Sequence, residues 1–291
     1  MPTHRCIQLD DRGLIRIEGS EARPFLQGLI SNDMDILQPE SAIYAALLTP
    51  QGKYLFDFLL YDRGGHLLLD GEKARLAELL RRLTMYRLRS KVTLADVSEE
   101  LGVLAVFGRK PLSAATLPPA VEDPRLPELG LRLVLPRVGM DGFIAAHGLE
   151  RVDFAQYDRL RLGLGVPDGS RDLVVDRSLL LESGFEELHG VSFTKGCFVG
   201  QELTARTKHR GLVKRRLLPV RVDGPLPAPG TLITRAGKDA GEMRSGDGNL
   251  ALALLRLEQL GAGEDPLTAG EAILTPAPPA WLPMAALARG R

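Results

Sequence analysis

The sequence predicts an α+β fold of several modules that ends in a small β-barrel. In the N-terminal part, apolar runs of strand length and amphipathic helical patterns follow one another in the order βαβββαβ, which mixes hairpins with helices and differs from a doubly wound parallel sheet. From about Val213 onward, short apolar runs are separated by Gly and Pro, a texture typical of a small barrel or sandwich. The length of 291 residues suits two or three such modules.

The first module is expected over residues 1–97. Its hairpin is the clearest element, because the turn Thr49-Pro-Gln-Gly-Lys53 separates two apolar runs. Leucines at three- and four-residue spacing, with arginines on the opposite face, predict its second helix. In order, the expected elements are a strand at 14–18, a helix that follows the N-cap Gly19-Ser20 and carries Phe25, Leu26, Leu29 and Ile30, strands at 43–48, 54–61 and 66–69, a helix at 76–86 and a strand at 92–95.

A second α+β module is expected over 98–212, and the β-barrel over 213–291. The second module contains a proline-rich connection at 111–127 and ends in the segment SFTKGCFVGQELTARTKHRG, Ser192 to Gly211. The expected elements are strands at 103–107 and 131–135, helices at 153–162 and 202–208, and barrel strands at 217–222, 232–234, 250–255 and 272–274.

The composition excludes several classes of function. With 37 basic and 37 acidic residues, the chain lacks the basic excess of a nucleic-acid-binding protein. No apolar run is long enough for a membrane span and the N-terminus lacks a signal pattern, so we expect a cytoplasmic bacterial protein. The two cysteines, Cys6 near an N-terminus expected to fray and Cys197, form neither a disulfide framework nor a closed zinc site.

Cys197 lies on a glycine-flanked turn that follows a lysine. A thiolate is both a nucleophile and a soft-metal ligand, and nearby positive charge and helix-start amides favour its formation. Lys195 and the amides that follow it offer both, and Gly196 and Gly200 leave the backbone free to turn and expose the sulfur. The alternatives are a small buried cysteine and a redox-sensing thiol. A lone cysteine cannot hold an iron–sulfur cluster, so further ligands would have to come from a partner.

The eight residues Lys195-Gly-Cys-Phe-Val-Gly-Gln-Glu202 resemble the K-G-C-[FY]-x-G-Q-E signature of the YgfZ-type folate-binding proteins, bacterial relatives of a mitochondrial iron–sulfur assembly factor. Leu14 to Asp33, Tyr44 to Asp57 and Tyr157 to Gly165 are similar to further blocks of this family and, more distantly, of the glycine-cleavage T-protein, an aminomethyltransferase. The resemblance implies a T-protein-like fold around a central cavity that holds tetrahydrofolate. It also implies a role in the assembly or repair of iron–sulfur clusters.

The resemblance assigns roles to individual residues. Cys197 is the expected catalytic residue and transient iron or cluster ligand, shared with an iron–sulfur carrier or scaffold protein that serves client iron–sulfur enzymes. Glu182 matches an acidic position that suits a bidentate hydrogen bond to the pterin edge, and a solvated loop acid is its alternative. The expected folate-binding residues are Asn32, Asp33, Asp57, Arg87, Arg89, Glu182, Lys195, Gln201 and Glu202.

Two departures from the transferase relatives bear on function. Where those proteins carry G-G-I-x-D-D, this chain has Gly52-Lys-Tyr-Leu-Phe-Asp57, so Phe56 replaces one carboxylate of a pair. Where they carry L-R-L-E-A-G, Gly163 replaces the acid. Loss of the acid pair removes charge stabilisation that an aminomethyl-transfer intermediate needs. The sequence therefore favours a tetrahydrofolate-binding assembly factor over the alternative, a tetrahydrofolate-dependent aminomethyl or methyl transferase.

Overall fold

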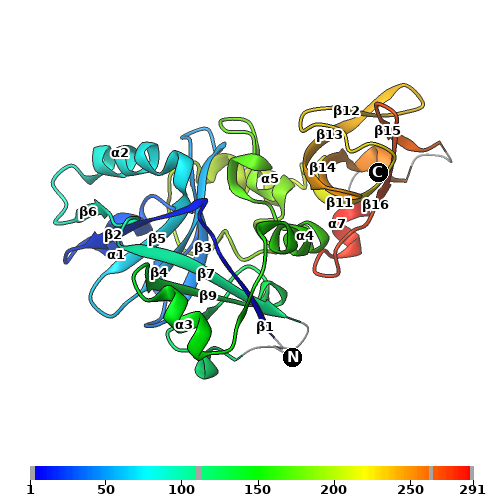
Figure 1. Ribbon diagram of the computed structural model, residues 1–291. Helices are drawn as coiled ribbons and strands as arrows, with labels where there is room; N and C mark the ends of the chain where they lie inside the picture. Colours follow the sequence, from blue (N-terminus) through cyan, green and yellow to red (C-terminus); the bar gives the residue numbers. More distant parts are fainter. Residues whose placement is uncertain (1–3, 109–112, 262–264, 289–291) are drawn as a thin grey trace. The chain divides into compact units, whose positions relative to one another are not determined.

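The computed structural model of the chain describes residues 4–108, 113–261 and 265–288. The chain groups into two compact units that interleave along the sequence (Figure 1). The first unit comprises Met1–Leu48, Leu55–Phe154 and Leu188–Val199, and the second comprises Thr49–Tyr54, Ala155–Glu187 and Gly200–Arg291. The α+β class is confirmed, and the division into 1–97, 98–212 and 213–291 stays a prediction.

The first unit contains a five-stranded sheet that confirms the expected N-terminal elements. Its strand order is β3-β4-β5-β2-β6. Helix α2 turns the leucines Leu76, Leu79 and Leu83 to the core, as the three- and four-residue spacing predicts. The elements are β2 Arg12–Glu18, α1 Ala22–Gln27, β3 Ala42–Leu48, β4 Tyr54–Asp62, β5 Leu67–Glu72, α2 Leu76–Arg87 and β6 Thr93–Asp96.

Helix α1 is shorter than predicted. Its N-cap is Glu21 rather than Ser20, and no side chain makes a capping hydrogen bond there. The helix ends at Gln27, so Leu29 and Ile30 are buried beyond it rather than within it. This early end leaves backbone carbonyl groups that side-chain donors have to satisfy.

A second five-stranded sheet of the first unit has the order β10-β1-β7-β9-β8 and contains a strand that the sequence patterns missed. This strand, β1, pairs with β7 on one side and β10 on the other and buries Cys6 completely. The expected fraying at Cys6 is therefore wrong. Residues 109–112 of the segment after β7 lie outside the described residues. The strands are β1 His4–Gln8, β7 Leu101–Gly108, β8 Val121–Glu122, β9 Leu131–Pro136 and β10 Glu150–Arg151, of which β7 and β9 confirm predicted strands.

Buried charged side chains join the two sheets of the first unit. Arg132 of β9 donates to Asp70 of β5 and to Asp123, each at 2.9 Å. Arg12 donates to Asp70 at 2.6 Å, and Arg125 pairs with both oxygens of Asp123 at 2.9 and 2.7 Å. Burial alone would raise the pKa of Asp123, but Arg125 and Arg132 outweigh burial and hold this pKa below its usual range. The Arg132–Asp70 pair therefore joins the two sheets, and the pairs of Arg12 and Arg125 extend this buried network on either side of it.

The second unit contains the predicted barrel, which closes in the order β11-β14-β13-β12-β15-β16 (Figure 1). Aliphatic side chains such as Leu218, Val220 and Leu255 fill it. Its strands are β11 Arg215–Asp223, β12 Leu232–Arg235, β13 Lys238–Asp247, β14 Leu250–Arg256, β15 Leu267–Ala269 and β16 Ala272–Pro276, with short helices α6 Leu257–Leu260 and α7 Met284–Ala288. The sequence patterns missed β13 and β15, because neither contains a continuous apolar run.

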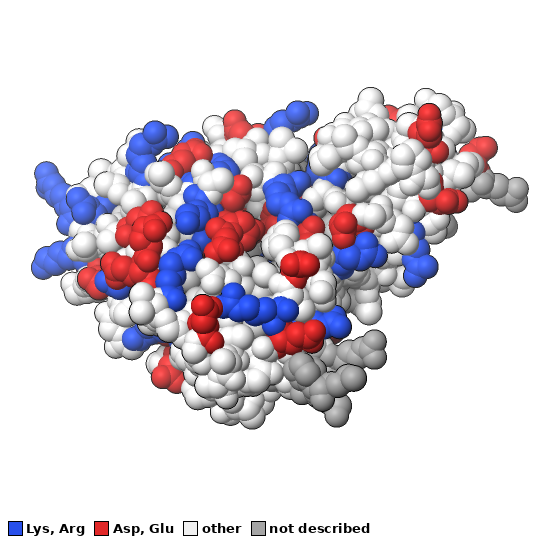
Figure 2. All heavy atoms as spheres, viewed as in Figure 1, with Lys and Arg blue, Asp and Glu red and all other residues white. Residues whose placement is uncertain are grey.

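Two helices of the second unit confirm predictions, namely α4, Phe154–Leu164, and α5, Gln201–His209. Helix α3 of the first unit, Met140–Ala146, was not predicted. Within the described ranges, no helix has the length and apolar character needed to cross a membrane. Acidic and basic side chains both occur across the face drawn in Figure 2, in keeping with the zero net charge.

Candidate functional site

Cys197 lies on an exposed turn of the first unit. Its thiol is free and exposed, whereas Cys6 is free and buried. Gly196, with φ of 91°, and Gly200, with φ of 82°, flank the turn in a backbone region that glycine adopts without strain. Phe198, next to the thiol, is buried. The predicted exposure of the sulfur on a tight turn is confirmed, and the buried-cysteine alternative is wrong for Cys197.

Lys195 fastens this turn to the C-terminal end of α1. Its Nζ atom donates to the carbonyl oxygens of Gln27, Ile30 and Asn32, each at 2.7 Å. A protonated lysine has three N–H donors, so these three acceptors use all of them. The lysine thereby satisfies the carbonyl group of Gln27, the last residue of α1, and two carbonyl groups of the segment that follows the helix.

The surroundings of the Lys195 ammonium group set its charge. Burial lowers the pKa of Lys195 to about 8, while the carboxylates of Asp33 and Asp35 act in the opposite direction. The Nζ atom also lies 5.3 Å from the centroid of the Phe198 ring. The ammonium group therefore carries its charge at neutral pH, and it lies close to the ring of Phe198, the residue that follows Cys197.

Asn32 and Asp33 lie beside Lys195 and bind the protein's own backbone. The Nδ2 atom of Asn32 donates to the carbonyl oxygens of Tyr44 and His189, each at 2.7 Å, and its Oδ1 atom accepts from the amide of Asp33 at 2.8 Å. Asp33 caps the short helical turn that follows. Three of the predicted folate residues thus come together at the end of α1, where they hold the segment that carries Cys197.

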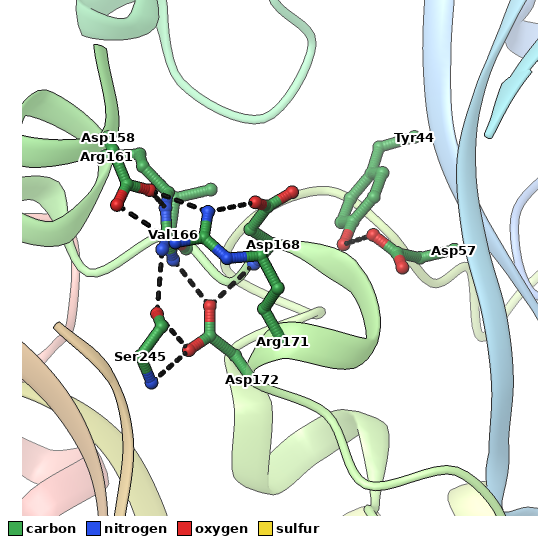
Figure 3. Close-up of polar contacts among 9 residues, drawn as sticks. All are labelled: Tyr44, Asp57, Asp158, Arg161, Val166, Asp168, Arg171, Asp172 and Ser245. Carbon is green, nitrogen blue, oxygen red and sulfur yellow. Dashed lines mark hydrogen bonds and ion pairs between the residues drawn. The ribbon is translucent and has the colours of Figure 1, made fainter. Parts of the chain in front are cut away.

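Asp57 is buried on β4 and accepts a hydrogen bond from the Tyr44 hydroxyl at 2.8 Å (Figure 3). Burial and the Asp57 carboxylate raise the pKa of Tyr44 well above its ordinary value, so the phenol stays a donor. The Arg125 guanidinium lies 5.6 Å from the Tyr44 ring centroid. The neighbouring Phe56 packs beneath Arg75, 4.2 Å from its ring centroid. Asp57 thus has a phenol as partner, and position 56 supplies no second carboxylate.

Glu182, Gln201 and Glu202 belong to the second unit. Glu182 is buried, and its two oxygens accept from Arg215 at 3.2 and 3.0 Å, so the alternative of a solvated loop acid is wrong. Gln201 and Glu202 begin α5, and Glu202 pairs with Arg206 one turn later at 2.6 Å. Since Arg215 already binds the carboxylate of Glu182, the pterin contact stays a prediction.

Arg87 and Arg89 lie where α2 ends. Arg87 closes the helix, and its Nη1 atom lies 3.5 Å from the carbonyl oxygen of Val92. Within the described part of the chain, neither arginine forms an ion pair, and no hydrogen bond joins either one to Asn32 or Lys195. The two arginines are therefore not joined by hydrogen bonds to the predicted residues at the C-terminal end of α1, and their folate contacts stay a prediction.

A buried ionic cluster of the second unit was missed by the sequence patterns (Figure 3). Arg161 of α4 donates to Asp158 at 2.7 Å, to Asp172, and to the Ser245 hydroxyl at 2.7 Å. Asp172 accepts from the amide of Ser245 at 3.0 Å, and Arg171 binds both oxygens of Asp158 at 2.9 and 3.0 Å. The cluster ties α4 to barrel strand β13. Its partners lie up to 84 residues apart, so local periodicity does not reveal it.

The hairpin turn Thr49–Lys53 packs directly against the start of α5. Gly52 has φ of 71°, and a Cβ atom there would lie 2.8 Å from the carbonyl oxygen of Gly200 and 2.9 Å from Leu203. Only glycine fits such an approach without displacement of backbone. The helix that begins after the Cys197 turn is therefore supported by a neighbouring backbone.

The described residues contain no group of three or more His, Cys, Asp and Glu side chains that could hold a metal ion. Iron–sulfur clusters usually take four protein ligands. No such set of ligands is therefore offered around Cys197 by the described residues.

Comparisons with known proteins reveal the relationships of the chain. Residues 7–128 match the GCVT N-terminal domain, and residues 214–284 match the CAF17 C-terminal beta-barrel domain. The chain is 37% identical to the mitochondrial iron–sulfur cluster assembly factor IBA57 of Mus musculus, over 97% of this chain and 86% of the relative. It is 38% identical to the Homo sapiens protein of the same name, over 88% and 78%.

The fold has a wider relationship. The crystal structure of glycine cleavage system aminomethyltransferase T from Bartonella henselae aligns with a TM-score of 0.76 and 16% identity, over 100% of this chain and 88% of that one. This likeness confirms the T-protein-like fold, while the identity to the mitochondrial proteins extends over both matched domains. The chain therefore belongs to the IBA57 family of iron–sulfur cluster assembly factors, the wider group that includes the YgfZ-type proteins.

Proposed function

We propose that this chain assists the assembly or repair of iron–sulfur clusters by lending the Cys197 thiolate to iron, or to a cluster, that a carrier or scaffold protein holds. The observation that supports the proposal is an exposed thiol in a chain whose described residues offer no complete set of metal ligands. Cys197 is exposed, and the described residues contain no group of three metal-ligating side chains. The metal is cargo that the partner brings and retains through its own ligands.

The anchored turn suits a transient ligand. Three hydrogen bonds at Lys195 and the buried Phe198 ring restrain the backbone on both sides of the thiol. A ligand held in place before binding loses little conformational entropy when it binds, so one thiolate adds more to the stability of a shared cluster. We assign Lys195 to this positioning role.

Tetrahydrofolate is the proposed small-molecule ligand, supported by the match of residues 7–128 to the GCVT N-terminal domain. The predicted residues fit it in part. Arg87 and Arg89 form no ion pair within the described residues and suit the carboxylates of the folate glutamate. Asn32 and Glu182, in contrast, give polar atoms to protein partners. Bound folate would supply a pterin and an anionic tail. Among the residues of this chain, cluster ligation is assigned to Cys197 only.

Two features make a folate-dependent aminomethyl or methyl transferase the less favoured function. Phe56 contributes an aromatic ring under Arg75 where a second carboxylate would be needed, and Gly163 has no side chain to bind the pterin. The names of the matched relatives place those proteins in mitochondria, and a cytoplasmic location of this chain stays our prediction.

The proposal is tested by anaerobic reconstitution of the full chain with an iron–sulfur carrier protein, followed by visible absorbance of the complex separated from both free proteins. We compare the wild type with Cys197→Ala and with the matched control Cys6→Ala, each with and without tetrahydrofolate. We expect cluster absorbance in the complex for wild type and Cys6→Ala, and its loss for Cys197→Ala.

Equal cluster absorbance for wild type and Cys197→Ala would refute ligation by Cys197. The folate arm is read separately, by isothermal calorimetry of tetrahydrofolate with each variant. Because Cys197 is not among the folate-binding candidates, we expect unchanged folate affinity in Cys197→Ala. A lost folate affinity would place Cys197 in the folate site instead of at the cluster.

A further inference from the structure

Exposed apolar side chains gather where α2 ends. Met85 is 69% exposed, Tyr86 39% and Leu88 86%, so large apolar groups follow one another on the surface of the first unit. The core face of α2 is formed by other residues, Leu76, Leu79 and Leu83 among them. Exposed apolar patches of this kind on soluble proteins mark binding surfaces more often than scattered single residues do.

Leu88 also adopts a backbone conformation that leucine avoids. Its φ is 46° and its ψ −108°, in a region where glycine is favoured. The strain does not bury the leucine side chain, which stays 86% exposed. Folding of the isolated chain therefore gains little from this leucine, whereas a partner that covered it would gain apolar contact.

Basic side chains surround the apolar residues. The stretch 80–95 carries Arg81, Arg82, Arg87, Arg89 and Lys91 and no acidic residue, in a chain whose net charge is zero. Of these five, only Arg82 forms an ion pair within the described residues, with Glu78 at 3.1 Å. Figure 2 shows Lys and Arg side chains, with Asp and Glu side chains among them, over the part of the first unit where Figure 1 places α2 and β6. We call Arg81, Met85, Tyr86, Leu88, Arg89 and Lys91 the α2-end surface.

A hollow and a sheet edge adjoin the α2-end surface. Glu21, Leu88, Arg89 and Ser90 line the hollow, which has a volume of about 730 Å³. Glu21, its acidic residue, accepts a hydrogen bond from the backbone amide of Lys91. Strand β6, which follows Lys91 in sequence, is the edge strand of its sheet and pairs there with β2 alone. The hollow thus offers an apolar group beside a cation without an ion pair, and β6 offers backbone groups to an extended segment.

We infer that the α2-end surface docks the iron–sulfur carrier or scaffold protein through an acidic segment of that protein with apolar anchor residues. The inference deepens the proposed function and rests on it. Arginines without an ion pair that lie around exposed apolar groups favour a partner segment in which carboxylates flank an apolar side chain. The carboxylates then pair with the arginines, and the apolar side chain packs against Met85, Tyr86 or Leu88.

Helix α1 relates this surface to Cys197. Glu21 lies at the N-terminal end of α1 and lines the hollow, while Gln27 lies at the other end and accepts from Lys195. The six residues of α1 span about 9 Å at 1.5 Å per residue. A protein interface of ordinary size covers about 800 Å² on each partner and so extends roughly 30 Å. The length of α1 is therefore smaller than one such interface, so we infer that a single docked partner covers the α2-end surface and extends to the Cys197 turn.

The test is isothermal calorimetry of the full chain with the cluster-free carrier protein at low and high salt. The variants are Met85→Ser with Leu88→Ser, and Arg81→Glu with Arg89→Glu. The matched control, Leu232→Ser with Lys238→Glu, removes an exposed leucine and reverses an exposed charge on the barrel. Because all these side chains are exposed, we expect wild-type thermal unfolding throughout.

We expect each α2-end variant to weaken carrier binding about tenfold or more, and the charge variant also to reduce its salt dependence. The barrel control should bind within about twofold of wild type. Cys197→Ala should bind the cluster-free carrier like wild type and yet form no shared cluster. If Cys197→Ala loses the shared cluster while both α2-end variants bind the carrier with wild-type affinity, ligation by Cys197 is supported and docking at this surface is overturned.

Two further outcomes would overturn the inference. Wild-type carrier affinity in both α2-end variants would do so directly. Unchanged carrier affinity, together with weakened binding of phosphatidylglycerol vesicles, would reassign the surface to a membrane. Weaker binding of tetrahydrofolate triglutamate by Arg81→Glu with Arg89→Glu is expected from the folate role proposed for Arg89, so carrier affinity alone decides the docking. If docking depends on the α2-end surface while Cys197→Ala still forms the cluster, docking stands and the ligand role of Cys197 falls.

Discussion

The ammonium nitrogen of Lys195 and the carbonyl oxygen of Asn32 lie 2.7 Å apart, so the charge of the Lys-Gly-Cys sequence is directed to the backbone at the end of α1. Two more carbonyl oxygens, of Gln27 and Ile30, share the same nitrogen at the same distance. We therefore expect Lys195 to affect Cys197 through the position of the turn that both belong to.

Replacement of Lys195 by Met keeps the length of the side chain and removes all three donors. Half-buried carbonyl groups lose their partners, so we expect the free energy of unfolding to fall by about 1–3 kcal/mol. We also expect less shared cluster at equal protein concentration, because Cys197 is no longer held. Chemical denaturation and cluster absorbance measure the two effects. Lys195→Arg keeps the charge but spreads its donors over a plane, so it should recover only part of both. Full cluster formation by Lys195→Met would contradict the positioning role.

Replacement of Gly163 and of Gly165 by alanine should change the free energy of unfolding in opposite directions. At Gly163, inside α4, an added Cβ meets Leu250 at 3.7 Å, an ordinary contact, so Gly163→Ala should raise the free energy of unfolding by about 0.5–1 kcal/mol. Gly165 has φ of 73°, and its Cβ would lie 3.1 Å from Pro219. Gly165→Ala should therefore lower the same quantity by about 1–3 kcal/mol. Thermal unfolding decides, and destabilisation by Gly163→Ala would be inconsistent with the space at this position.

Arg161→Met should be among the most destabilising substitutions in the second unit. It leaves the carboxylates of Asp158 and Asp172 buried with one cation fewer, which costs about 3–5 kcal/mol. Arg159→Met on the same helix is the control, because Arg159 pairs with Asp247 at 3.4 Å on the surface and should cost less than about 1 kcal/mol. Urea denaturation compares the two, and similar losses would show that the buried cluster contributes no more than a surface pair.

The stabilising contribution of Asp123 to the free energy of unfolding should be lost in acid. Its pKa in the folded chain lies below its usual range, whereas an unfolded chain titrates its aspartates near pH 3.9. Below about pH 4 the unfolded chain therefore binds a proton that the folded chain resists, so the contribution of Asp123, complete above pH 5, declines as pH falls. Asp123→Asn should show a smaller decline in unfolding free energy between pH 5 and 3, while the exposed-site control Glu128→Gln keeps the wild-type decline. Identical pH curves for wild type and Asp123→Asn would rule out this linkage.

The elements that could be predicted from the sequence have a repeating apolar pattern. Strands β3, β4 and β14 contain continuous apolar runs, and α2 repeats leucine at helical spacing. Strand β1 could not be predicted, because His-Arg-Cys-Ile-Gln contains no such run and becomes buried through its two neighbouring strands. Strand β13 could not be predicted either, because it consists largely of polar residues and glycine. Its place in a closed barrel, and not its composition, makes it a strand.

The candidate site shows a similar division. Cys197 could be found because an exposed-turn cysteine is unusual in this composition and lies in a specific signature. The anchoring of Lys195 could not, because its three acceptors are backbone carbonyls 163 to 168 residues away and backbone atoms leave no signal in a sequence. The pairing of Glu182 with Arg215 escaped for a related reason, since it requires knowledge of which loop meets the first barrel strand.

The unequal exposure of Cys6 and Cys197 gives the chain two chemical reporters of different kinds. A thiol reagent added to the native protein meets Cys197, while Cys6 lies in a paired strand, and burial raises the pKa of its thiol. The first reaction should slow whenever a carrier covers the turn, and the second should follow only the opening of the strand. A single labelling time course, resolved by mass spectrometry, can therefore count docked molecules and unfolded molecules in the same tube.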